Sequence, residues 1–293
     1  MPSTVTVLGA NGQLGSDVCL AFAERGWIVR PLIHTDLDIA IATERQMSEI
    51  LGDGAPSVVV NTAAFTDVPR CEIEPERAFA VNAEAVRRLG RACGTLGARF
   101  MHLSTDYVFD GAKRVPYVES DAPHPIQVYG TTKLAGEGFA SAEAPRWSVV
   151  RTSGLYGAKP CRGKGGANFV STMLRLARER GEVTVVDDEW VTPTYTKDLA
   201  EQLERIAAAD ATGLFHATPQ GQVTWHDFAA AIFEITGTRV ALKRTTAAQF
   251  PGKVRRPAYS VLENAALKTL GLDAMPDWRS SLERFLRETD STG

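Results

Sequence analysis

VTVLGANGQLG, residues 5–15, decides the fold: a β-branched run leads into Gly9, Gly12 and Gly15, and a helical pattern follows. Gly9 permits a tight turn, Gly12 lets the backbone approach a pyrophosphate, and Gly15 allows the next helix to pack closely. The N–H groups at the N-terminus of that helix face the same anion. The stretch predicts a dinucleotide site, with a purely structural turn as the alternative.

Strand and helix patterns alternate through the first half of the chain. Strands are predicted at 4–8, 27–33, 58–61, 99–104 and 148–152, and helices at about 14–25, 44–51, 75–96 and 128–140. Strict alternation predicts an α/β protein with a doubly wound parallel (Rossmann) sheet and helices on both faces. Sheets of this kind bind ligands at the carboxyl ends of their strands.

The second half is less regular. Helices are predicted at 169–180, 224–237 and 278–289, and strands at 182–188 and 213–218. We therefore expect an NAD(P)-binding domain over 1–155 and a smaller C-terminal α/β substrate-binding lobe over 156–293. Elements at about 183–218 are expected to return to the first domain.

Composition limits the partners. The 293 residues are 44% hydrophobic and 23% charged, with a net charge of −3 and no long basic run, so we expect neither nucleic acid nor membrane as a partner. The N-terminus lacks the pattern of a signal peptide, which predicts a soluble, cytoplasmic protein. Neither the four cysteines nor the five histidines have metal-ligand spacing, so no metal is expected. A homodimer is one expected assembly.

Tyr129 and Lys133 stand four residues apart in VYGTTKLAGE, residues 128–137, which has helical patterning. Residues four apart share a helix face, so both side chains can reach one site. A free tyrosine has a pKa of roughly 10. A nearby ammonium lowers that pKa and makes the phenol a better general acid. The spacing alone also fits two unrelated polar side chains.

Thr105 is the companion of this pair. MHLSTDYVFDG, residues 101–111, has a strand pattern that ends at about Thr105, where a hydroxyl can bond a substrate carbonyl. Tyr107 is a competing proton donor, but no lysine follows it four residues later, and its surroundings are typical of packing and a turn. We predict Thr105, Tyr129 and Lys133 as the catalytic set.

The end of the second predicted strand bears on the cofactor. An acidic residue there would bind the ribose hydroxyls of NAD, but the sequence has Ile33, His34 and Thr35, and Asp38 comes later. NADPH and NADH therefore both stay open. Arg30 could contact a 2′-phosphate, although a solvated arginine is the simpler interpretation.

The chain resembles the dTDP-4-dehydrorhamnose reductase family of extended short-chain dehydrogenases/reductases. The matching stretches run in family order over almost the whole chain: GANGQLG, DLDI, VVNTAAFTDV, EPERAFAVNAEAV, STDYVFDG, YGTTKLAGE, RTSGLYG, NFVSTMLRLA, PTYTKDLA and RRPAYSVLEN. The resemblance implies reduction of the C4 ketone of a nucleotide-linked 4-keto-6-deoxysugar, most simply dTDP-4-dehydro-L-rhamnose, with Tyr129 as the proton donor.

The resemblance also implies the binding residues. The cofactor would contact the glycine loop, the segment after the second strand, the loop after the third and the end of the fourth: Gly9, Gly12, Gln13, Leu14, Gly15, Asp38, Ile39, Ala63, Ala64, Thr66 and Leu103. Tyr129 and Lys133 would also touch it. The nucleotide sugar would contact Thr105, Asp106, Gly154, Asn168 and Arg256.

Several positions depart from the family pattern. Gly154 stands in RTSGLYG where the family usually has a tryptophan packed by the sugar, and DEWVTPT carries Glu189 and Val191 in place of glutamine and glycine. Trp190 could replace the lost aromatic surface or pack in the core. Two alternatives stay open: a sugar-nucleotide 4-epimerase, and a non-catalytic dinucleotide-binding subunit like the regulatory subunit of methionine adenosyltransferase.

Overall fold

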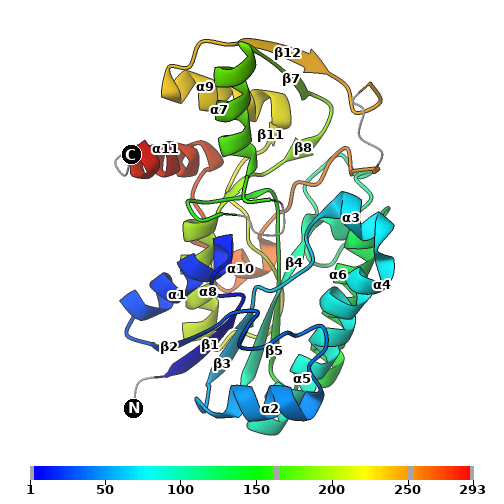
Figure 1. Ribbon diagram of the computed structural model, residues 1–293, viewed down its shortest axis with the longest axis vertical. Coiled ribbons are helices and arrows are strands. Elements are labelled where there is room, and N and C mark those ends of the chain that lie inside the picture. The colour runs from blue at the N-terminus through cyan, green and yellow to red at the C-terminus, as the bar shows by residue number, and fades with distance from the viewer. Residues whose placement is uncertain (1–2, 161–164, 250–253, 291–293) are drawn as a thin grey trace.

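The computed structural model describes residues 3–160, 165–249 and 254–290, and a six-stranded parallel sheet forms its centre (Figure 1). The strands lie side by side in the order β10 (Gly213–His216), β5 (Trp147–Thr152), β4 (Arg99–Thr105), β3 (Val58–Asn61), β1 (Thr4–Leu8) and β2 (Ile28–Leu32). β2 lies on one side of β1, whereas β3 and the strands that follow it lie on the other side. The strand order therefore reverses between β1 and β3. Ligands bind at such a switch point.

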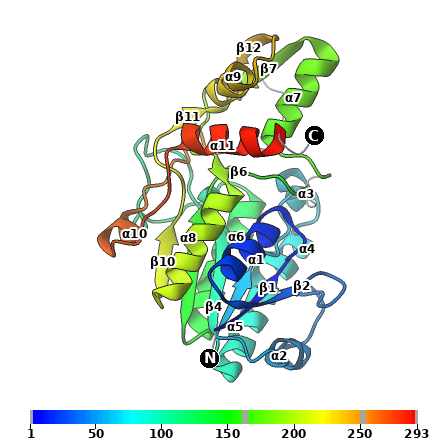
Figure 2. The ribbon, with the colours of Figure 1, turned by 90° about the vertical axis from the view of Figure 1, so that its left-hand side faces the viewer.

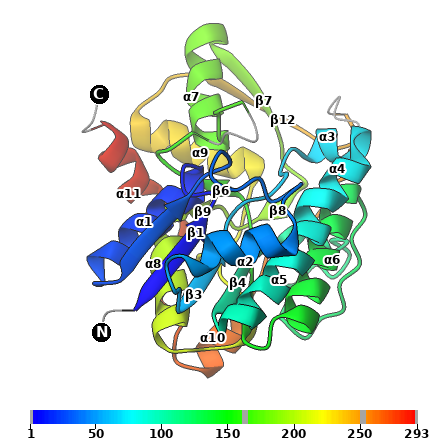
Figure 3. The ribbon, with the colours of Figure 1, turned by 60° about the horizontal axis from the view of Figure 1, so that its bottom comes forward.

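Helices cover both faces of this sheet, as Figures 2 and 3 show. On one face, α1 (Gln13–Glu24) and α8 (Thr196–Ala208) share a core with β1, in which Val7 and Leu203 are fully buried. On the other, α2 (Glu44–Gly52), α5 (Ala85–Leu96) and α6 (Val128–Glu143) pack around Val59 and Phe100. Because both faces are covered, the central strands β1, β3 and β4 are almost entirely buried. The predicted doubly wound fold is confirmed.

The predicted helix over 75–96 is confirmed in its bounds, and it contains a π-helical segment that the sequence pattern did not indicate. It consists of α4 (Pro75–Phe79), the π-helical segment η1 (Ala80–Glu84) and α5. In η1, Asn82 accepts a hydrogen bond from the Phe65 N–H over 2.8 Å and donates to the Phe65 carbonyl over 3.0 Å. These bonds fix the loop after β3 against the helix, and π-helical insertions of this kind are frequent at functional sites.

A smaller lobe lies beside the carboxyl ends of the large sheet (Figure 1). It contains α7 (Phe169–Arg180), α9 (Trp225–Thr236), α11 (Trp278–Asp290) and the parallel pair β7 (Glu182–Val186) and β12 (Ala241–Thr245). Within the segment expected to return to the first domain, β7 belongs to this lobe, whereas α8 and β10 pack with the large sheet. A domain boundary near residue 155 stays a prediction.

Short elements connect these parts, and the sequence pattern did not predict them. They are α3 (Val68–Ile73), η2 (Asp106–Val108), β6 (Leu155–Tyr156), β8 (Trp190–Val191), β9 (Thr194–Tyr195), β11 (Val223–Thr224) and α10 (Ala265–Thr269). Each has seven residues or fewer in the sequence, too few for a clear periodicity. None of the described helices is both long and apolar enough to cross a bilayer.

Candidate active site

A cavity of about 1830 Å³ opens at the carboxyl ends of the central strands and extends to the smaller lobe. Pockets for a single small ligand usually have roughly 300–1,000 Å³. The cavity therefore has room for two bound molecules side by side. Its walls come from the glycine loop, the segments after β2 and β3, the end of β4, the start of α6, and the smaller lobe.

The predicted site residues converge on this cavity. Those that line it are Gly9, Gly12, Gln13, Leu14, Asp38, Ile39, Ala63, Ala64, Thr66, Leu103, Thr105, Asp106, Tyr129, Lys133, Gly154, Asn168 and Arg256. Gly15 is the exception, and its place in the fold explains its role. A Cβ atom added to Gly15 would lie 2.2 Å from the Gly9 carbonyl oxygen, so only glycine lets α1 approach the loop this closely.

Thr105 and Asp106 end β4 inside the cavity. The Thr105 hydroxyl donates to Asp106 Oδ1 over 3.0 Å and accepts from the Tyr107 N–H over 3.2 Å. The Ser153 hydroxyl donates to Asp106 Oδ2 over 2.9 Å. Burial raises the pKa of Asp106 to about 6, against the hydrogen bonds that favour its charged form. The end of β4 thus presents a hydroxyl whose orientation is fixed by its neighbours.

Tyr129 and Lys133 lie one turn apart on α6, facing the end of β4. Gln127 caps the helix, because its side-chain oxygen accepts from the Gly130 N–H over 2.8 Å. The Tyr129 ring meets the Tyr107 ring edge to face, with 6.1 Å between centroids. Tyr107 also lines the cavity, so it is more than the packing residue that its sequence surroundings indicated.

The protonation of this pair differs from the sequence expectation. Burial raises the pKa of Tyr129, and the hydrogen bond between Tyr129 and Thr105 acts in the opposite direction. The Lys133 amine donates instead to the Leu103 carbonyl over 2.6 Å and lies 3.2 Å from His102 Nε2. In this structure the phenol therefore keeps its proton near neutral pH, which is the form that a proton donor needs.

Comparison with known proteins identifies the family. A family model described as "RmlD substrate binding domain" matches residues 3–291. The chain belongs to this family. The prediction made from the ordered motifs is thereby confirmed.

Relatives of the RmlD-type chain match over nearly their full length. It is 37% identical over 287 residues to the spore coat polysaccharide biosynthesis protein SpsK of Bacillus subtilis, with 98% of each chain covered. It is 37% identical over 303 residues to the dTDP-4-dehydrorhamnose reductase of Burkholderia thailandensis, covering 97% of this chain and 98% of that one. A crystal structure of dTDP-4-dehydrorhamnose reductase from Bacillus anthracis in complex with NADP has 34% identity and a TM-score of 0.93, covering 98% and 100%.

Gly154 marks where this RmlD-type chain departs from the family pattern. Its φ of +55° lies in the left-handed region, and a Cβ atom there would lie 3.2 Å from Pro193 Cα and 3.4 Å from both Trp225 and Val191. Trp225 and Trp190 both line the cavity, and the Trp225 ring packs on Phe169 with 4.6 Å between centroids. Aromatic surface therefore reaches this part of the cavity from α9 and β8.

We expect Gly154→Trp to destabilise the fold by about 2–6 kcal/mol, because a strained backbone and an overpacked wall each cost about 1–3 kcal/mol. Urea unfolding would measure the loss. Gly138→Ala is the matched control, since nothing lies within 4 Å of a Cβ added on that exposed part of α6. A Gly154→Trp protein as stable as the wild type would show that this wall can rearrange.

Other predicted binding residues have different positions. Asn168 caps α7 by accepting from the Ser171 N–H over 3.0 Å and donates to the Gly157 carbonyl over 2.9 Å, so both ends of its amide already have partners. Arg256 is exposed at the cavity wall. Arg30 donates to the Ile50 and Leu51 carbonyls at the end of α2 and does not line the cavity, which favours the simpler interpretation over a contact with a 2′-phosphate.

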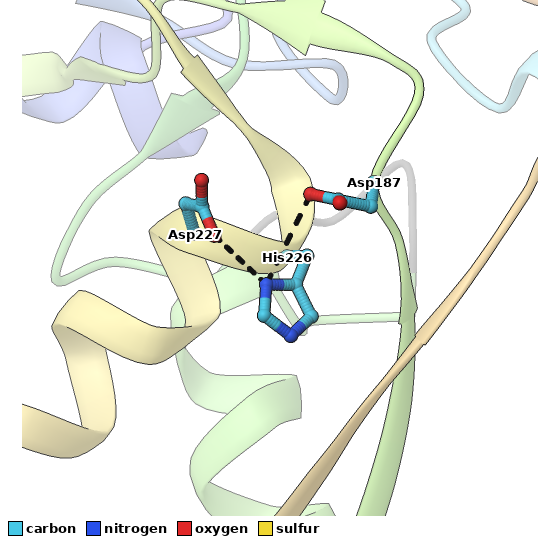
Figure 4. Close-up of side chains that lie close together, drawn as sticks. All are labelled: Asp187, His226 and Asp227. Carbon is cyan, nitrogen blue, oxygen red and sulfur yellow. Dashed lines mark hydrogen bonds and ion pairs between the residues drawn. The ribbon is translucent and has the colours of Figure 1, made fainter.

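One group of side chains in the described residues has the composition of a metal site. His226 Nδ1 lies 2.9 Å from Asp227 Oδ1 and 4.0 Å from Asp187 Oδ1 (Figure 4). Arg244 of β12 forms ion pairs with both carboxylates. The group is thus an ion-pair network that joins β12 to the start of α9 and to the residue after β7.

Proposed function

We propose that the chain reduces the C4 ketone of a nucleotide-linked 4-keto-6-deoxysugar, with dTDP-4-dehydro-L-rhamnose as the expected substrate and dTDP-L-rhamnose as the product. The observation that carries the proposal is the meeting of Thr105, Tyr129 and Lys133 on one wall of a cavity with room for two ligands. Relatives named dTDP-4-dehydrorhamnose reductase and the related structure with bound NADP support it.

The cofactor would be NADPH or NADH, held on one side of the cavity. Gly9, Gly12, Gln13 and Leu14 surround the N-terminus of α1, where backbone N–H groups suit a pyrophosphate. The adenine would lie by Asp38 and Ile39. The remaining cofactor contacts are proposed for Ala63, Ala64, Thr66 and Leu103. When bound, the reduced nicotinamide supplies the hydride.

The chain's own groups would orient the ketone and supply the proton. The Thr105 hydroxyl would bond the sugar carbonyl, and the Tyr129 phenol would donate its proton to the oxygen as negative charge develops there. Lys133 would contact the nicotinamide ribose and stabilise the phenolate left behind. Asp106, Gly154 and Asn168 would border the sugar.

Arg256 would meet the nucleotide end of the substrate from its exposed position on the cavity wall. Residues 1–155 would bind the dinucleotide and 156–293 the sugar nucleotide. The loop at 158–168 also carries basic residues whose type suits a diphosphate, but Lys159 does not line the cavity, and Arg162 and Lys164 lie outside the described residues. We expect the protein to be cytoplasmic and to form a homodimer. Sedimentation of the purified protein would test the homodimer.

A panel assay tests the reaction. We expect oxidation of NADPH or NADH with a dTDP-linked 4-keto-6-deoxysugar, and slower turnover with the UDP- and GDP-linked sugars, because the nucleotide end supplies binding energy for the transition state. Measuring absorbance of the reduced cofactor across the panel would rank them. No oxidation with any sugar, together with a stoichiometric complex with a synthetase, would favour the regulatory-subunit alternative. Interconversion of C4 epimers without net oxidation would favour an epimerase.

A further inference from the structure

Three polar side chains form a buried row behind the catalytic face: Asn61 at the end of β3, His102 in β4 and Lys133 on α6. Their exposed fractions are 1%, 0% and 2%. Asn61 Nδ2 lies 3.2 Å from His102 Nδ1, and Lys133 Nζ lies 3.2 Å from His102 Nε2. Both imidazole nitrogens therefore have partners inside the protein.

The backbone fixes the direction of this row. The Ala63 N–H donates to Asn61 Oδ1 over 3.1 Å, so the oxygen is the accepting end of the amide and Nδ2 is the donor toward His102. A ring nitrogen that accepts a hydrogen bond carries no proton, and a neutral imidazole has one protonated and one unprotonated nitrogen. Nδ1 is thus unprotonated, and the ring proton is on Nε2.

The Nε2–H of His102 then points at the Lys133 amine. An ammonium group has donors only, so a charged Lys133 would place two donors face to face across 3.2 Å. A neutral amine can accept from Nε2–H and still donate to the Leu103 carbonyl 2.6 Å away. We propose that Asn61 fixes His102 in its Nε2–H tautomer, and that this N–H favours the neutral form of the Lys133 amine.

The titratable groups around Lys133 agree with this assignment. Glu137, one turn further along α6, is the carboxylate that acts on Lys133, but Arg151 of β5 donates to it over 2.9 and 2.7 Å. Burial lowers the pKa of Lys133 to about 8, with Glu137 acting in the opposite direction. On the β4 side the titratable neighbour is His102, and Tyr129 lies one turn earlier on α6.

Asn61 and His102 act as positioning residues for the reaction proposed above. When Tyr129 gives up its proton, a positive Lys133 stabilises the phenolate, and a neutral Lys133 does not. The row therefore decides at which pH activity falls as Lys133 loses its charge. Only this kinetic consequence rests on the proposed function; the tautomer and the Lys133 titration do not.

Nitrogen-15 NMR of the full chain, labelled at histidine and lysine, tests the assignment without substrate. We expect the His102 signals, identified by their loss in His102→Gln, to show the Nε2–H tautomer from about pH 6 to 9. The Lys133 amine should titrate near pH 8, as its burial indicates. A His102 ring protonated on Nδ1, or on both nitrogens, would overturn the proposal. The measurement is made on the wild-type protein, and His102→Gln serves only to assign the signals.

Asn61→Asp should reverse the tautomer, because a carboxylate accepts from Nδ1–H and still accepts from the Ala63 N–H. His102 Nε2 then accepts from the ammonium, so the Lys133 titration and the alkaline limb of kcat/KM should both rise by about one pH unit, a tenfold change in proton affinity. A rise of the Lys133 titration without reversal of the His102 tautomer, which the added charge alone would produce, would refute the proposal. If NMR shows the expected His102 tautomer and Lys133 titration but the protein reduces no keto sugar, the proposed function is rejected and the inference about the row stands.

Discussion

Tyr129→Phe is expected to lower kcat for reduction of the keto sugar by about 10²–10⁴-fold, the usual contribution of a positioned general acid. The substitution removes only the phenolic O–H, and the Tyr129 ring can keep its edge-to-face contact with Tyr107. KM and the binding of the cofactor should change little. Steady-state oxidation of the reduced cofactor at saturating sugar would measure the effect.

Tyr107→Phe provides the matched control, because Tyr107 lines the same cavity and lacks a lysine one turn away. It should retain most of the wild-type kcat. A primary isotope effect with cofactor deuterated at C4 would establish that chemistry limits the rate. If Tyr129→Phe then turns over as fast as the wild type, the proton comes from another group.

Arg151→Met should destabilise the fold by about 3–5 kcal/mol, because it leaves Glu137 charged and unpaired in the interior. The side chains are 3% and 8% exposed, and two hydrogen bonds, of 2.9 and 2.7 Å, join them beneath the catalytic face. Urea unfolding at neutral pH would measure the loss.

The double variant Arg151→Met, Glu137→Met should recover most of this stability, because a buried ion pair replaced by apolar groups is often nearly neutral. Arg45→Met is the surface control: its ion pair with Glu49 is 87% and 60% exposed, and no measurable change is expected. A single variant as stable as the double one would mean that water or a neighbour compensates the Glu137 charge.

Local patterns predicted most of the fold and the centre of the site. The alternation of apolar runs and the glycine loop indicated the parallel sheet, and the four-residue spacing placed Tyr129 and Lys133 on one face of α6. Both signals depend on residues close together in sequence. Periodicity reports such neighbours directly.

The parts that escaped prediction depend on residues far apart in sequence. His102 and Lys133 meet across 31 positions, and Asn61 and His102 across 41, so no local spacing indicates their hydrogen bonds. The π-helical insertion at 80–84 has no distinct apolar period, and its contacts with the loop after β3 exist only in the folded chain. The residues that crowd the Cβ position of Gly154, Pro193 and Trp225, likewise lie far from it in sequence.

The Asn82 amide has a mechanical consequence. It bonds both backbone groups of Phe65 and also donates to the Thr132 hydroxyl over 3.1 Å, and Thr132 in turn donates to the Tyr129 carbonyl over 2.8 Å. One side chain therefore joins the loop on the proposed cofactor side to the helix turn that carries Tyr129. The loop after β3 and the turn of α6 that carries Tyr129 are thus fastened to each other through one buried amide as well as through the sheet.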